Sequence, residues 1–176
     1  MVGAGEGRSA VGVAERRSWV NRRNGYSLIE LLIVVSVILI IAAIAVPNFL
    51  RAKLAANEAS AVSSCRTVNT AEFTFMAFYQ QGYTSTLAQL GPPAGGPATS
   101  AAADLIDAGL AAGQRSGYLF SYTPGGLKDT VYTSYAFQAS PAIPNNTGTH
   151  YFFTDPSGVI RQNVGGPAGP SDSSVH

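Results

Sequence analysis

The chain contains few charged residues, and those it has are unevenly distributed. Charged residues make up 12% of the 176 residues, about half the share of an average soluble domain. The five arginines and two glutamates of residues 1–25 give that segment a net charge of +3, whereas the rest of the chain is net −2. Because no basic stripe remains beyond residue 25, the sequence argues against a nucleic-acid-binding domain. We expect no specific nucleic-acid binding.

The sequence has one cysteine, Cys65, so an intrachain disulfide is excluded. A lone cysteine in a helical sequence is more often a small buried apolar residue than a reactive thiol, and we predict the buried role for Cys65. An exported domain without a disulfide has to be held together by packing alone.

Recognisable catalytic motifs are also missing from the sequence. It contains no nucleophile elbow, Walker loop, CxxC pair or HExxH helix. Neither His150 nor His176 has a clustered partner in the sequence, and we expect both to be structural or solvated. Asp155 belongs to an Asp-Pro-Ser-Gly turn, and acidic residues are too sparse around it for calcium binding. We therefore expect a protein that is not an enzyme and has no cofactor and no metal site.

The most prominent feature present is a long apolar run, residues 28–49. About 20 apolar residues are enough for a helix that crosses a membrane. The basic residues before the run indicate that residues 1–25 stay in the cytoplasm. The run is interrupted at four positions, which are Glu30, Ser36, Pro47 and Asn48.

Three interpretations of this run compete. The first is a secretory signal with Ala43-Ile44-Ala45 as its cleavage site, and the second is a signal-anchor helix that holds a soluble domain outside. Neither explains Glu30, whose charge in a membrane helix costs about 2.5–3.5 kcal/mol. In the third, cleavage between Gly25 and Tyr26 creates an α-ammonium four residues before Glu30, which the Glu30 of a neighbouring subunit would neutralise. Snorkelling or protonation of Glu30 near the interface is the simpler alternative, and physical reasoning alone leaves it open.

Residues 25–30 (Gly-Tyr-Ser-Leu-Ile-Glu), the apolar run and residues 47–50 (Pro-Asn-Phe-Leu) together resemble the cleavage and methylation segment of type IV prepilins and pseudopilins. The resemblance extends over residues 22 to about 54. It implies that a prepilin peptidase cuts after Gly25 and N-methylates Tyr26, and that Glu30 acts in subunit assembly. Family members most often have Phe where this chain has Tyr26, and the leader of this chain is long.

The resemblance also implies the partners and the location of the protein. The partners would be other copies of the chain in a helical homopolymer, the peptidase, an inner-membrane assembly platform and minor pilins. The precursor would sit in the bacterial inner membrane, and the assembled product would be an extracellular type IV pilus. The alternatives are a pseudopilin in a periplasmic type II secretion pseudopilus and, from another class, an anchored or secreted binding domain that does not polymerise.

Beyond Pro47 no glycine or proline occurs before Gly82, and we predict a helix over residues 28–81. One face of its second half is apolar, with Leu54, Ala61, Cys65, Val68, Phe75 and Tyr79. We place Lys53, Asn57, Ser60 and Ser64 on the opposite side. Pro47 would either kink the helix or let the segment before it unwind on assembly, as the resemblance implies. Leu39 stands where relatives often have the glycine of that segment.

The remaining residues predict a small head of α+β, pilin-like fold. Strands are expected at residues 118–122, 131–139, 151–153 and 159–161, in a three- to four-stranded antiparallel sheet that packs on the apolar helix face. A turn is expected at residues 124–126 and a short helix near 104–108. The expected divisions are a leader (1–25), a membrane and filament-core helix (26–50), an amphipathic helix (51–81), a loop-rich connection (82–117), the sheet (118–164) and a flexible tail (165–176).

Overall fold

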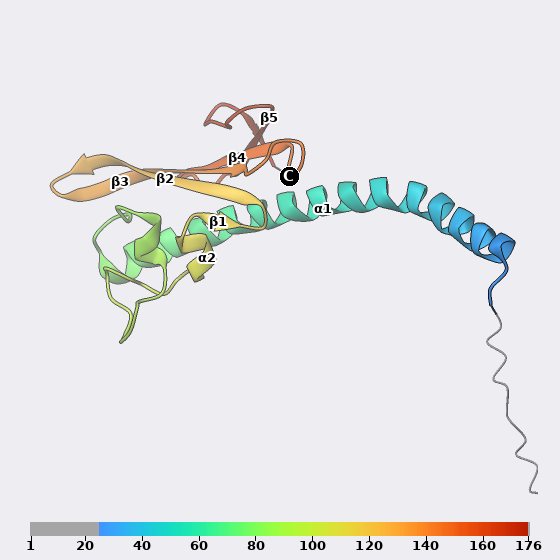
Figure 1. Ribbon diagram of the computed structural model, residues 1–176. Coiled ribbons are helices and arrows are strands. Elements are labelled where there is room, and N and C mark those ends of the chain that lie inside the picture. The colour runs from blue at the N-terminus through green and yellow to red at the C-terminus, as the bar shows by residue number, and fades with distance from the viewer. Residues whose placement is uncertain (1–24, 176) are drawn as a thin grey trace, which may run out of the picture. The chain divides into compact units, whose positions relative to one another are not determined.

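The computed structural model describes residues 25–175, so most of the expected leader and His176 lie outside the described residues. These residues divide into two compact units, one ending at Ile41 and one beginning at Ala42. The elements (Figure 1) are helix α1 (Leu28–Tyr79), 3₁₀-helix η1 (Leu87–Leu90), helix α2 (Ala108–Ala111), and strands β1 (Gln114–Arg115), β2 (Tyr118–Lys128), β3 (Val131–Pro141), β4 (His150–Thr154), β5 (Arg161–Val164) and β6 (Ser173–Ser174). A long helix with an antiparallel sheet confirms the predicted α+β, pilin-like fold class.

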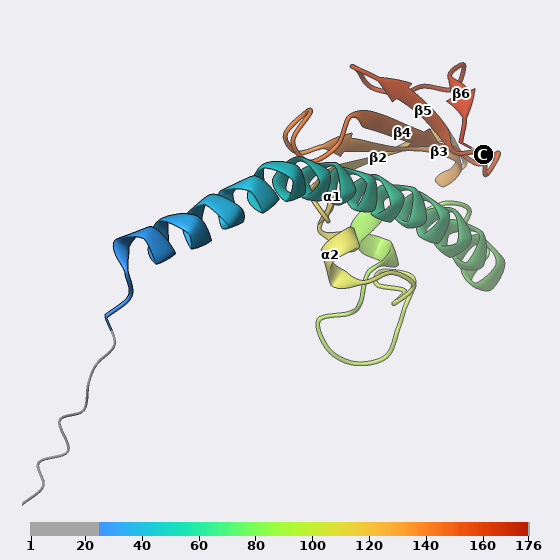
Figure 2. The same ribbon diagram turned by 90° about the vertical axis from the view of Figure 1, so that its right-hand side faces the viewer.

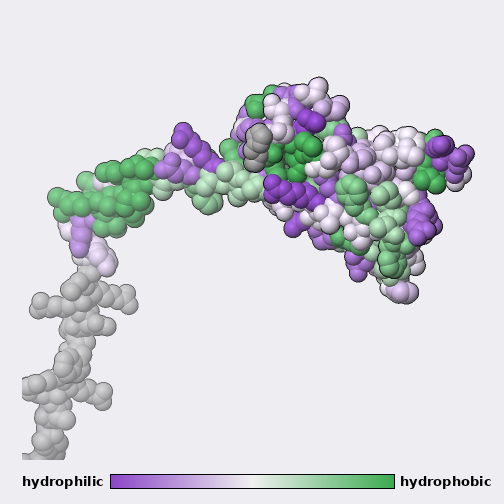
Figure 3. Space-filling model, turned by 180° about the vertical axis from the view of Figure 1, so that it is seen from behind, coloured by the Kyte–Doolittle hydropathy of each residue, from purple (hydrophilic) through white to green (hydrophobic). Residues whose placement is uncertain are grey.

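In the unit that ends at Ile41, α1 is apolar on every side. Its large hydrophobic side chains, from Leu28 onward, are between 45% and 84% exposed, and Figure 3 shows them as a hydrophobic band along the helix. By length and composition α1 is suited to cross a membrane. A helix that is hydrophobic all round requires lipid or other helices around it.

The second half of α1 packs on the sheet through the predicted face. Ala61, Cys65, Val68 and Phe75 are all buried, which confirms the periodicity seen in the sequence. The helix ends at Tyr79, two residues before the predicted end. Gln80 explains the difference, because its φ of 54° is a left-handed conformation that stops an α-helix.

The polar side that we assigned to α1 is partly wrong. Ser64 is buried, and its hydroxyl donates to the Ser60 carbonyl at 2.9 Å. Asn57 donates to the Thr147 carbonyl at 2.9 Å. A polar residue on this helix is therefore not always a solvent-facing one, because the loops of the head reach around it.

The sheet has six antiparallel strands in chain order, not three or four. The turn predicted at residues 124–126 is wrong, since these residues lie inside β2, which pairs with β3 along its length. Pro124 is tolerated inside β2 because β1 pairs only with residues 118 and 119. The rest of β2 is therefore an edge strand, where a missing N–H breaks no hydrogen bond to a neighbouring strand. The chain instead turns at Asp129 and Thr130, both with positive φ.

The end of the chain also departs from the prediction. β5 begins at Arg161, later than expected, and residues 155–158 form the turn before it, where the Asp155 carboxylate accepts from the Ser157 N–H at 2.9 Å. The predicted flexible tail is wrong for the described residues, because β6 pairs with β5 and Ala168 is buried. The turn role predicted for Asp155 is confirmed.

The connection between α1 and the sheet is folded back on the helix. In Figures 1 and 2 the second half of α1 lies between the sheet on one side and the segment with η1 and α2 on the other. Leu90, Ile106 and Leu110 from this segment are buried in the core shared with α1 and the sheet. The short helix begins later than predicted, because the Asp107 side chain caps it by accepting from the Leu110 N–H.

Candidate maturation and assembly segment

Gly25 lies just before α1 in an exposed position. A side chain at this position would meet no atom within 4 Å, and φ is outside the left-handed region. Packing and backbone geometry of the described residues therefore do not require glycine here. Recognition by another protein would explain the choice of glycine.

Tyr26 and Glu30 line one cavity at the start of α1. The helix begins with a hydrogen bond from the Leu31 N–H to the Ser27 carbonyl, 3.1 Å long. Tyr26 is 82% exposed, and a cavity of about 330 Å³ is lined by Tyr26, Glu30, Leu31 and Val34. The structure therefore brings these two predicted site residues onto the same surface.

Glu30 has no ion-pair partner among residues 25–175. It lies in the first turn of α1, where the partial positive charge of the helix N-terminus favours a carboxylate. Its other surroundings are exposed apolar side chains, which offer the charge no compensation. The carboxylate is thus accessible to a cation brought by another molecule.

Pro47 lies inside α1, which continues through it as one helix. The proline has no N–H and cannot donate the hydrogen bond to residue 43 that the helix pattern requires. The helix is therefore weakened at this point although it is not interrupted. Whether residues before Pro47 unwind concerns the assembled subunit and stays a prediction.

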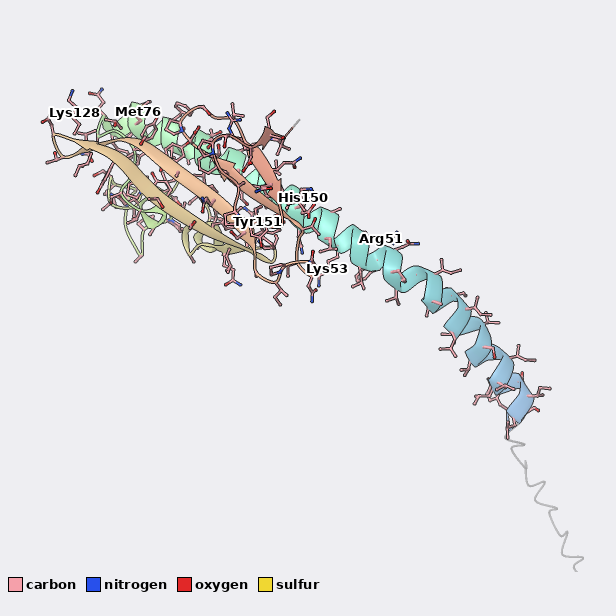
Figure 4. All side chains as sticks on the ribbon, turned by 90° about the horizontal axis from the view of Figure 1, so that it is seen from above. Arg51, Lys53, Met76, Lys128, His150 and Tyr151 are labelled. Carbon is pink, nitrogen blue, oxygen red and sulfur yellow. The ribbon has the colours of Figure 1, made fainter. Side chains whose placement is uncertain are left out.

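Glu58 on α1 forms a polar cluster with the start of β4 that sequence reasoning missed. Its carboxylate accepts from the Thr149 N–H at 2.7 Å and lies 3.0 Å from His150 Nδ1. The expectation that His150 has no partner is wrong, and Figure 4 shows His150 beside α1. Partial burial alone would raise the pKa of Glu58, but the hydrogen bonds from Thr149 and His150 hold it below its ordinary value.

Glu72 is fully buried between α1 and the chain that follows it. Its carboxyl group accepts from the Thr84 N–H at 3.1 Å and from the Thr84 hydroxyl at 2.5 Å. The Tyr122 hydroxyl donates to the Thr84 carbonyl at 3.0 Å. Burial raises the pKa of Glu72 above its ordinary value, because the charged form is poorly solvated there.

The sequence contains a signal that could have identified Glu72 as a buried residue. It lies four residues after Val68 and three before Phe75, so helical spacing puts it on the apolar face. The pair Glu58 and His150 carries no comparable signal, since 92 residues separate them. Their contact depends on the tertiary fold.

The described residues offer no evident metal centre or reactive thiol. Among residues 25–175 no group of three or more histidine, cysteine, aspartate and glutamate side chains is placed to hold a metal ion. Burial raises the pKa of Cys65 to about 12, which keeps the thiol protonated and unreactive. The predicted buried role of Cys65 agrees with its full burial.

Comparison with known proteins identifies the N-terminal segment alone. No curated protein and no solved structure matches the chain. Residues 20–46 match the family model described as the prokaryotic N-terminal methylation motif. This match includes Gly25, Tyr26 and Glu30, and the chain therefore carries the prepilin signal of type IV pilins and pseudopilins.

Proposed function

We propose that the chain is the precursor of a structural subunit of a type IV pilus or pilus-like filament. A prepilin peptidase cuts after Gly25 and methylates the new N-terminus at Tyr26, and the mature subunit polymerises through α1. The observation that carries the proposal is the exposed apolar surface of α1, together with Glu30, which lies within the matched motif and has no ion-pair partner among residues 25–175.

The electrostatics of the processed end support this assembly. Cleavage would create an ammonium at Tyr26, next to the N-terminus of α1, where the helix dipole disfavours positive charge. A carboxylate relieves this repulsion, and the pairing is strengthened where lipid or packed helices exclude water. The Glu30 of a neighbour displaced along the helix axis supplies that carboxylate and neutralises both charges.

The apolar surface supplies the contact between subunits. The large hydrophobic side chains from Leu28 to Leu50 are exposed in the described chain and require lipid or other apolar helices around them. Packing identical helices together exchanges lipid contacts for helix contacts, so the subunit moves from the inner membrane into a fibre without exposing this surface to water. The assembly platform and minor pilins would act at this step.

The position of Pro47 supports this proposed movement of the subunit from the membrane into the fibre. The residues before it, 40–46, are isoleucine, valine and alanine, and the β-branched members have lower helix propensity than alanine. The hydrogen bond lost at the proline weakens the helix further at this point. We place the site of unwinding here, where extended backbone would lengthen the subunit in the fibre.

Electron microscopy of fibres sheared from the cell surface tests the proposed function. Immunogold labelling or mass spectrometry should find this chain along the fibres. Its absence from surface fibres together with retention in a periplasmic complex would favour the secretion pseudopilus. A monomeric product that is never found in a polymer would favour the anchored or secreted binding domain and overturn the proposal.

A further inference from the structure

The head contains a cavity that the proposed polymerisation does not use. It has a volume of about 430 Å³ and lies between the segment after α1 and the tip of the β2–β3 hairpin. Figure 4 labels Met76 and Lys128 at this end of the head. The cavity has the size of a small-molecule site, about 300–1,000 Å³. Its polar lining is provided mainly by Gln81, Tyr83, Thr84, Gln89, Thr130 and Tyr132.

The backbone that lines the cavity is fixed before any ligand arrives. Gly82 has a φ of 73°, and a side chain there would collide with Val131 and with the Tyr132 carbonyl. This close approach lets the Tyr83 N–H donate to the Tyr132 carbonyl at 3.0 Å. Thr84, which also lines the cavity, is anchored to the buried Glu72. The two walls are thus joined, and binding requires little ordering of the backbone.

One wall is made by a strained turn. Asp129 and Thr130 both have positive φ, 49° and 72°. Turns of this kind favour asparagine and glycine, and positive φ is unfavourable for a β-branched residue such as Thr130. The two-residue turn of the β2–β3 hairpin requires positive φ at both positions, and it places Thr130 in one wall of the cavity.

The lining is uncharged, with mostly polar side chains and apolar surface from Phe75 and Val131. Amide, phenol and hydroxyl groups face the cavity, and no lysine, arginine, histidine, aspartate or glutamate lines it. Within residues 25–175 the side chains of Gln81, Tyr83 and Tyr132 make no hydrogen bond, so their polar groups are free for a ligand. The Tyr83 ring is held in place by an edge contact with Tyr135, with ring centroids 4.9 Å apart.

From this lining we propose that the cavity binds a neutral saccharide through one pyranose ring. An anion or cation would lose its hydration without gaining an opposite charge. A sugar presents hydroxyls that both donate to and accept from amides and phenols, and its C–H face packs on an aromatic ring. The head would therefore attach to uncharged glycans, and this binding does not depend on polymerisation.

Saturation-transfer NMR on the full chain in micelles of a detergent without a sugar headgroup tests the proposal. The probes are the methyl glycosides of glucose, galactose, mannose and N-acetylglucosamine. At least one should receive saturation on its ring protons. Failure of all four glycosides, or binding of a phenol or a neutral peptide in their place, would overturn the proposal.

Variants assign the binding to the cavity. Gln81→Ala and Tyr132→Leu each remove polar or aromatic contacts with the sugar and should weaken binding by about tenfold. Tyr151→Leu, at a half-buried tyrosine of β4 outside the cavity, is the matched control and should bind as the wild type does. Circular dichroism checks that each variant is folded. Undiminished binding in both folded cavity variants, or equal weakening in the control, would contradict the assignment.

Discussion

The three glutamates of α1 have different environments, and their positions decide what each can do. Glu30 is exposed among apolar side chains, Glu58 accepts hydrogen bonds from β4, and Glu72 is buried against Thr84. Helical spacing would have identified Glu72 as a core residue. Glu30 lies within the residues that match the methylation motif. Glu58 could not be predicted, because its partners come from a distant strand.

Replacing Glu30 with glutamine should leave membrane insertion intact and reduce filament yield by about tenfold or more, since a charge-assisted contact contributes about 1.5–3 kcal/mol. Quantitative immunoblots of membrane and sheared-fibre fractions measure both effects. Ser36→Ala is a suitable control, because the Ser36 hydroxyl bonds only to the Leu32 carbonyl of its own helix in the described structure. Wild-type fibre yield from Glu30→Gln would refute the assembly role.

Glu72 should make the head less stable as pH rises. Its pKa is raised on folding by burial, so its stabilisation is complete below the unfolded-state pKa of about 4.3 and is lost as pH increases through the folded-state pKa. Glu72→Gln resembles the protonated side chain and should remove this part of the pH dependence. Thermal unfolding of the full chain in detergent, followed by circular dichroism across pH, measures it. An unchanged pH slope in the variant would show that Glu72 does not titrate in this way.

Glu58 should have the opposite effect and make the head less stable as pH falls. Its pKa is lowered on folding, so its stabilisation is present above about pH 4.3 and is lost as pH falls through the folded-state pKa. Glu58→Ala leaves the Thr149 N–H without its acceptor and should destabilise the head by about 1–3 kcal/mol at neutral pH. Chemical denaturation at neutral and acidic pH gives both values. A loss that is equally large under strongly acidic conditions would rule out a role for the charged carboxylate.

At the scale of the elements, the sequence patterns predicted α1 better than the sheet. The apolar run and the later 3–4 periodicity identify a helix and its core face, because both signals are local. The length of β2 could not be predicted, since whether Pro124 is tolerated depends on β2 having a free edge beyond β1. The sequence of the tail likewise gives no sign of β6, which exists because β5 offers it an edge.

The hydrogen bond missing at Pro47 should make α1 less stable just before this residue. Pro47→Ala restores the missing backbone N–H and should stabilise the helix before this position by about 3 kcal/mol. Hydrogen exchange in micelles should then be slower for the amides of residues 43–46. If unwinding of this segment accompanies assembly, fibre yield falls at the same time. Slower exchange with an unchanged fibre yield would show that assembly does not require unwinding.

At the scale of the whole molecule, the two units have different requirements. The unit from Ala42 onward buries its own core of α1, the sheet and the connecting segment. In the described part of the unit before it, residues 25–41, the large apolar side chains are exposed and form no buried core. This surface requires lipid or other apolar helices around it. In the proposed assembly, identical subunits replace the lipid after maturation at Tyr26.

Mass spectrometry of the N-terminus of the mature chain, taken from membranes and from sheared fibres, tests the central claim most directly. We predict a first residue of Tyr26 with a methylated α-amine in both fractions. A mature chain that begins at Val46, or one that keeps residues 1–25, would contradict both the cleavage after Gly25 and the assembly that depends on it.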